Sequence, residues 1–172
     1  MRRTFVALVI AFVMTAGQAL AVSEVKIGVV DLQRAVTESK EGIAARAELL
    51  RKTEEFNAEL KLMMADFEKM RAELEKDASK LSTDAKAEKE KQIQKKGRDF
   101  QNRQREAQEE IKLLETEQVK KVVLHLGAVL ARIGDDGNYT AVLDRNTGVF
   151  YASKGIELTT VLVKRADEEY RK

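Results

Sequence analysis

One apolar stripe with heptad spacing runs through the middle of this sequence and constrains its fold more than any other feature. In "LKLMMADFEKMRAEL", residues 60–74, apolar side chains recur at alternating steps of three and four, and charged residues stand between most of them. This spacing places the apolar residues on one face of a helix. An apolar face must be buried, so the stripe predicts a helix that packs along its length against a partner.

The stripe belongs to a helix predicted from about Gln33 to about Lys80, capped by Asp31 and preceded by a short apolar run, Val25 to Val30, that is typical of a strand. At a rise of 1.5 Å per residue, this helix would be about 70 Å long, longer than any globular core that the chain could build. Its predicted inward positions are Ile43, Leu49, Leu50, Phe56, Leu60, Met63, Phe67, Met70, Leu74 and Leu81.

A second stripe of matching length runs from about Asp84 to Ile133. The segment between the two stripes contains the only plausible reversal, where Ser82 or Thr83 can cap a new helix. Two matched stripes joined by a tight turn predict an antiparallel coiled-coil hairpin over residues 35–134, with its tip near residues 80–85. The second set of inward positions is Ile93, Phe100, Ala107, Ile111, Leu114, Val122, Leu126, Val129 and Ile133, interrupted by Gly97, Gln104 and Gln118.

The two ends of the chain are predicted to form one small base, because an antiparallel hairpin returns the chain to its starting point. After "GDDGN" (134–138), the runs 139–144 and 149–153 flank "RNTG" and predict a β-hairpin. A last amphipathic helix should follow a cap at Thr159 or Thr160, with Val161, Leu162, Ala166 and Tyr170 on one face. Residues 22–34 and 135–172 make a base of only about 50 residues, so self-association is expected.

The first 21 residues are predicted to be a signal peptide. Two arginines precede an apolar run over residues 5–16, and "ALA" at 19–21 is a small-x-small cleavage pattern. We therefore expect cleavage near Ala21/Val22 and export of the mature chain; an uncleaved anchor is the alternative. The sequence contains no Cys, which excludes disulfides, so stability must come from packing or assembly.

No catalytic, cofactor-binding or metal-binding residues are predicted. The sequence has no phosphate-binding loop, and its single histidine, His125, lies within the second helix. "DDGN" lacks the spacing and the closing Glu of a calcium loop. Carboxylates are plentiful but fall on exposed helical faces, whereas catalysis needs groups that converge in a pocket. We expect neither an enzyme nor a cofactor.

Positive charge is concentrated near the predicted tip. Residues 86–105 contain eight Lys and Arg against three Asp and Glu, a net charge of +5. One interpretation is a solvated face with i,i+4 pairs; the other is attraction to acidic partners or anionic lipid headgroups. Nucleic acid is not expected as a partner of an exported protein. For an anionic partner, the candidate residues are Lys95, Lys96, Arg98, Arg103 and Arg105.

Both ends of the mature chain resemble the Skp/OmpH family of periplasmic chaperones. The motifs are "KIGVVDLQRAV" (26–36) and "YTAVLDRNTGVFYASKGIELTTVLVKRADEEY" (139–170), and the resemblance covers essentially the whole mature chain. It implies a mainly α fold, with a long antiparallel coiled-coil hairpin on a small β-containing trimerisation base. It further implies a periplasmic homotrimer whose arms enclose unfolded outer-membrane proteins without ATP. The family's basic cluster for lipopolysaccharide has no residue-by-residue match in this sequence.

Two residues are predicted to line the cavity of such a container. At about 100° per residue, Leu62 lies about 120° and Met64 about 80° from the centre of the first stripe, so neither belongs to the seam. Flexible, polarizable Met suits a surface that binds many clients. Leu62 and Met64 are therefore the predicted client-binding residues. Two alternatives stay open: a structural coiled coil of the cell envelope, and a lipid- or lipopolysaccharide-binding module.

Overall fold

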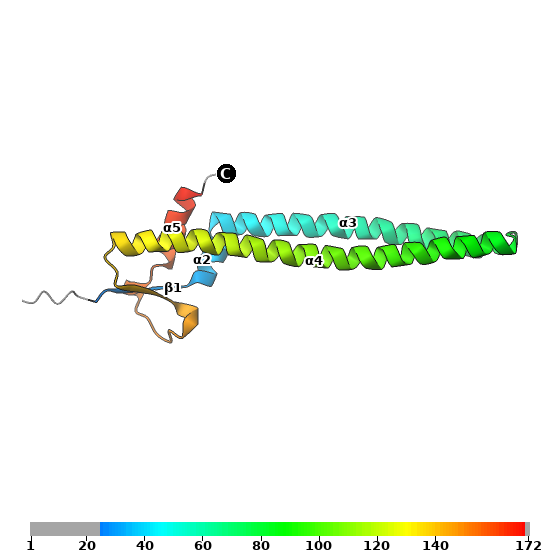
Figure 1. Cartoon of the computed structure of the whole chain (residues 1–172). Coiled ribbons are helices and arrows are strands. Elements are labelled where there is room, and N and C mark those ends of the chain that lie inside the picture. Colours follow the sequence, from blue (N-terminus) through cyan, green and yellow to red (C-terminus); the bar gives the residue numbers. More distant parts are fainter. Residues whose placement is uncertain (1–24, 171–172) are drawn as a thin grey trace, which may run out of the picture.

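The computed structural model describes residues 25–170 of the 172-residue chain, so the predicted signal peptide lies outside the described residues. A long helical hairpin extends from a small base (Figure 1), and the predicted architecture of a helical arm on a β-containing base is confirmed. In chain order the elements are β1 (Ile27–Val30), α2 (Leu32–Glu38), α3 (Lys40–Asp77), α4 (Thr83–Asp136), β2 (Ala141–Asp144), the 3₁₀ turns η1 (Arg145–Thr147) and η2 (Lys154–Ile156), and α5 (Thr159–Glu169).

The arm consists of α3 and α4, which run antiparallel and pack along the length of α3 (Figure 1). Ser82 caps α4, because its side chain accepts a hydrogen bond from the Ala85 N–H at 3.3 Å. Phe56 and Ala107 are buried between the helices, and the other inward side chains of the outer arm are half-buried. Half-buried seam residues are Leu60, Met63, Phe67, Met70 and Leu74 on α3, and Ile93, Phe100, Ile111 and Leu114 on α4.

Three of the seam assignments are wrong. Leu49 takes the inward position, and Leu50, about 100° further around the helix, turns outward and is 58% exposed. Ile43, one heptad before Leu50, faces outward in the same way. On α4, Gln104 is exposed and the preceding Arg103 takes the inward position.

Gly97 packs into the seam rather than interrupting it. A Cβ built on Gly97 would lie 3.3 Å from Cε2 of Phe67, so the missing side chain leaves room for the phenyl ring. The small residue Gly97 on α4 is therefore matched to the large residue Phe67 on α3.

The first helix is not continuous, as the periodicity predicts, but breaks at Ser39. Ser39 has extended backbone angles, ends α2 and caps α3 by accepting a hydrogen bond from the Gly42 N–H at 3.2 Å. A Cβ on Gly42 would lie 1.7 Å from the carbonyl oxygen of Val36, so this corner requires glycine. The heptad pattern misses the break because Ser is tolerated in a helix and also caps one.

The sheet is also different from the predicted one. β2 pairs with β1 in parallel, with Val142 opposite Gly28, and residues 139–153 form no β-hairpin. Parallel strands need a crossover connection, and here the whole arm is that connection. After β2, the η1 turn and Gly148, at a φ of 104°, redirect the chain, so residues 149–153 form no strand.

The main core of the described residues lies in the base, where α2, α4, α5 and β1 meet. Asp31 caps α2 as predicted, by accepting a hydrogen bond from the Arg34 N–H at 2.9 Å. Thr159 does not cap α5: it is fully buried, and its hydroxyl accepts a hydrogen bond from the Asp31 N–H at 2.8 Å. Val161 is 50% exposed and is not part of the inward face of α5. Buried in the core are Val30, Ala35, Val122, Leu126, Val129, Ile133, Leu158, Leu162 and Ala166.

Candidate functional site on the arm

Both predicted client-binding residues lie on the surface of α3. Leu62 is 71% exposed and Met64 is 40% exposed, so neither belongs to the seam. They are two positions apart, which corresponds to about 200° around a helix, and they therefore leave α3 on nearly opposite sides. One concave surface can be lined by Leu62 or by Met64, but not by both.

Met64 belongs to a row of exposed apolar side chains on one flank of α3. Ile43, Leu50 and Met64 are separated by seven and fourteen residues, so they share one side of the helix, and they are 57%, 58% and 40% exposed. We call these three residues the apolar row; it spans about 30 Å at 1.5 Å per residue. The heptad pattern hides the row, since it assigns Ile43 and Leu50 to the seam. The adjacent pair Leu49-Leu50 is the signal that reveals it, because only one of two neighbours can face inward.

A second exposed apolar surface lies on the base. Phe150 and Tyr151, between η1 and η2, are 101% and 84% exposed, and Leu143 on β2 is 44% exposed. A group of large apolar side chains that is exposed in one place often marks a surface that contacts another molecule. Within residues 25–170, nothing covers them, and β2 has β1 as its strand partner on one edge only.

Arg103, predicted as part of an anion-binding group, instead holds the two helices of the arm together. Its guanidinium donates two hydrogen bonds to the Glu59 carboxylate, at 2.8 and 2.9 Å, and one to Glu110 at 2.9 Å. It also lies over the ring of Phe56, 4.8 Å from the ring centre. The hydrogen bonds to Glu59 and then Glu110 raise the pKa of Arg103, and the same contact lowers the pKa of Glu59. Arg103 is therefore held by contacts within the arm, and its role in binding an anionic partner stays a prediction.

The other four predicted cations remain on the surface near the tip. Lys95, Lys96 and Arg98 are exposed and form no ion pair within the described part of the chain. Arg105 donates a hydrogen bond to Asn102 at 3.1 Å. Steps of three and seven residues place Lys95, Arg98 and Arg105 on one flank of α4, while Lys96 is about 100° away from Lys95. The structure thus brings three of the five candidates together.

Ionic contacts around His125 connect helices of the arm and the base. His125 connects three helices: its Nδ1 lies 2.6 Å from Glu41 of α3, and its Nε2 lies 3.9 Å from Glu169 of α5. Across residues 25–170, no three His, Cys, Asp or Glu side chains are arranged to hold a metal ion. None of the helices in that range is long and apolar enough to cross a membrane. The arm exposes the apolar row on α3 and a cluster of positive charge near its tip.

Comparison with known proteins agrees with this architecture. The fold is similar to the crystal structure of an OmpH-like protein from Caulobacter crescentus CB15, described as a candidate outer membrane chaperone, with 21% identity and a TM-score of 0.81. That similarity covers 85% of this chain and 86% of the other. No curated protein matches the sequence significantly. The family model "Outer membrane protein (OmpH-like)" matches residues 26–165, which include both strands, the whole arm and most of α5. The chain therefore belongs to the OmpH-like family.

Proposed function

We propose that this protein is an ATP-independent periplasmic holdase chaperone. In this proposal, a homotrimer encloses unfolded outer-membrane proteins between its arms and prevents their aggregation, without catalysis or a cofactor. The observation that carries the proposal is the apolar row, which a chain of the OmpH-like family exposes on an arm that extends from its core. The similar protein from Caulobacter crescentus is described as a candidate outer membrane chaperone, which supports the same role.

The chemistry of the arm suits clients of this kind. Unfolded transmembrane β-strands alternate apolar and polar residues, so they need apolar contacts without a fixed shape. Single exposed side chains spaced along a helix provide such contacts, and Met adapts its shape to different neighbours. Because Leu62 and Met64 face opposite ways, we propose Met64, with Ile43 and Leu50, as the client-facing flank. Leu62 then marks the other side of α3.

The base supports assembly into an oligomer. A two-stranded sheet is too small to be stable alone, and β2 has an edge without a partner strand within residues 25–170. Phe150 and Tyr151 are exposed beside it and would be buried by neighbouring copies. The number three comes from the family resemblance, as does the periplasmic location, which also requires removal of residues 1–21.

Aggregation of an unfolded outer-membrane β-barrel protein tests the proposal. The barrel protein is diluted from urea with and without residues 22–172 of this protein, in the absence of ATP, and light scattering is recorded. We expect suppression at about one trimer per client. Met64→Ser should weaken it, whereas Leu62→Ser, a matched change on the opposite side, should not. No suppression by the unmodified chain would rule the holdase out, and the reverse ranking of the variants would place the cavity on the Leu62 side.

A second candidate function is binding of anionic lipid or lipopolysaccharide. The observation that favours it is the flank formed by Lys95, Arg98 and Arg105, where the two residues nearest the tip have no ion pair among the described residues. Binding to vesicles that contain anionic lipid should then fall with salt and with replacement of all three residues by Gln. Vesicle binding without client protection would favour this function over the chaperone. A purely structural envelope coiled coil would show neither activity.

A further inference from the structure

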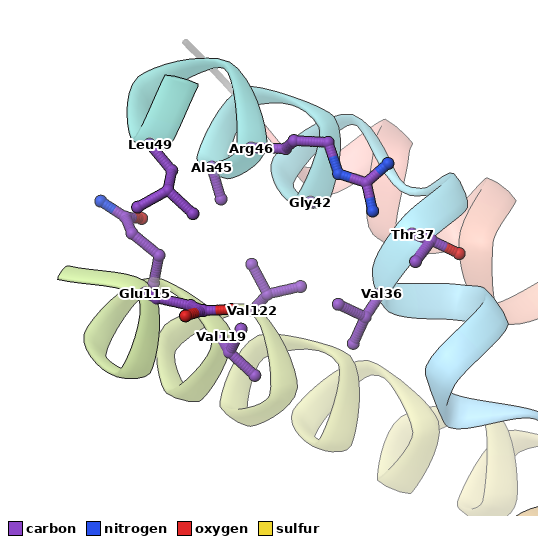
Figure 2. A pocket seen from close by; sticks show the side chains of 10 residues that line it. Val36, Thr37, Gly42, Ala45, Arg46, Leu49, Glu115, Val119 and Val122 are labelled. Carbon is purple, nitrogen blue, oxygen red and sulfur yellow. The ribbon is translucent and has the colours of Figure 1, made fainter. Parts of the chain in front are cut away.

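A cavity of about 140 Å³ lies at the root of the arm, bordered by α2, α3 and α4 and open to solvent on one side (Figure 2). Four apolar side chains point into it: Val36 from α2, Ala45 and Leu49 from α3, and Val122 from α4. Arg46 of α3 and Glu115 of α4 stand at its edges. Helices that pack closely normally fill the space between them, so an apolar opening of this size at the root of the hairpin calls for an explanation.

The cavity is a consequence of the corner at Ser39. Gly42 must be glycine because the α2–α3 corner brings Val36 too close for a Cβ, as shown above. The next residue of α3 that faces the gap is Ala45, which is also small. The residues of α3 that face Val122 before Leu49 are therefore small, and they leave the space between the helices unfilled. The space is built by the sequence of the corner and is not a defect at a helix end.

The size and the mainly apolar lining of the cavity suit an aromatic ring, and Thr37 and Gln118 add polar groups to the lining. An apolar cavity of about 150 Å³ in another protein holds a benzene ring, so this one matches a single phenyl ring. Arg46 and Glu115 form no ion pair within the described residues and offer a cation and a carboxylate at the edge. A cation can bond a peptide carbonyl and a carboxylate can accept from a peptide N–H. The combination fits an apolar ring that is attached to a polar main chain.

We propose that this cavity binds one aromatic side chain of an unfolded outer-membrane β-strand. The inference rests on the proposed chaperone function and adds a defined anchor to it. Transmembrane strands alternate apolar and polar residues and carry aromatic residues near both ends. In an extended strand, neighbouring side chains point to opposite sides, so one inserted ring leaves the next residues outside. The cavity would thus hold a client at its aromatic positions, while the apolar row supplies less specific contacts.

Binding of a minimal probe tests the site directly. N-acetyl-phenylalaninamide is titrated into the full mature protein, residues 22–172, with labelled valine methyl groups, and the methyl signals of Val36 and Val122 are followed by NMR. We expect saturable shifts, and at least about tenfold weaker binding of N-acetyl-alaninamide, because the methyl group buries far less apolar area. Absence of saturable shifts at both valines would overturn the proposal. So would contacts from a neighbouring subunit to these methyls, since the cavity would then be filled by assembly.

Matched variants separate the cavity from the rest of α3. Ala45→Leu should fill the space and abolish the probe-induced shifts, whereas Ala58→Leu, the same change at an exposed position of α3, should leave them unchanged. Unchanged binding in Ala45→Leu would contradict the proposal. If Ala45→Leu loses its helical circular dichroism, Leu49→Ala decides instead: the wider cavity should bind N-acetyl-tryptophanamide more tightly than the unmodified chain does, and failure to do so counts against the site.

Client binding distinguishes this inference from the function on which it rests. Ala45→Leu should bind an unfolded barrel protein about fivefold to tenfold more weakly than Ala58→Leu, since one anchor among several contacts is lost. Full aggregation suppression by the unmodified chain, together with equal client affinities of the two variants, would overturn the anchor and leave the chaperone function standing. If the chain binds the probe but protects no client, the aromatic ring that the cavity binds does not come from an unfolded outer-membrane strand, and the proposal is overturned.

Discussion

Truncation of Phe56 should destabilise the arm more than truncation of Phe67, although both residues occupy the same apolar stripe. Phe56 is 9% exposed and lies beneath the Arg103 guanidinium, whereas Phe67 is half-buried against Gly97, which has no side chain. A fully buried Phe→Ala change costs about 3–5 kcal/mol of unfolding free energy, so Phe56→Ala should cost about 3–4 kcal/mol. A smaller cost, about 2–3 kcal/mol, is expected for Phe67→Ala, since this side chain is only partly buried.

Two measurements check this ranking. Urea unfolding followed by circular dichroism reports the total loss of helix, and amide hydrogen exchange of peptides from α3 reports the local stability of the arm. The local measurement is necessary because an arm that extends beyond its base can open without global unfolding. Leu62→Ser is the control: this side chain is 71% exposed, so its replacement should change stability by no more than about 0.5 kcal/mol.

Either of two results would contradict the predicted ranking of Phe56→Ala and Phe67→Ala. If Phe67→Ala costs as much as Phe56→Ala, burial in a single chain does not describe the arm, and a neighbouring subunit covers its outer half. If Phe56→Ala costs as little as Leu62→Ser, the seam does not hold α3 and α4 together.

Three further predictions concern the tip, the base and the first cap. Deletion of one matched heptad from each helix, residues 71–77 and 87–93, should shorten the arm and leave the oligomer intact in native mass spectrometry; a monomer would place the interface in the arm. Amide exchange should be fast around residues 75–105 and slow at Val29, which is 3% exposed, and the opposite order would contradict a mobile tip on a stable base. Asp31→Ala should cost about 1 kcal/mol at neutral pH. A hydrogen bond from a backbone N–H lowers the pKa of Asp31, so this contribution is complete above the usual pKa of about 4 and is lost as the pH falls below it. Urea titrations of both chains at pH 7 and pH 3 should therefore differ less at pH 3; an equal difference at both would contradict the assignment.

Heptad spacing alone predicts the arm. A stripe of apolar residues at steps of three and four must be buried along its whole length, and a second helix with the same stripe buries it. The matched lengths of the two stripes and the cap at Ser82 then place the tip. Asp31 is equally readable, since its side chain caps the residues that directly follow it. All of these features depend on residues that are close in the sequence, so the local spacing of residues is enough to predict them.

Features that depend on distant partners could not be predicted in this way. The pairing of β2 with β1 and not with residues 149–153 depends on the arm acting as a crossover, and no local pattern encodes that choice. Arg103 reads as one more cation until Glu59, forty-four positions away, is placed beside it. The cavity likewise needs Val36, Ala45 and Val122 to meet across three helices. Charge and apolarity are properties of single residues, but whether a side chain is free to bind a partner is decided by what packs against it, and only the tertiary structure supplies that neighbour.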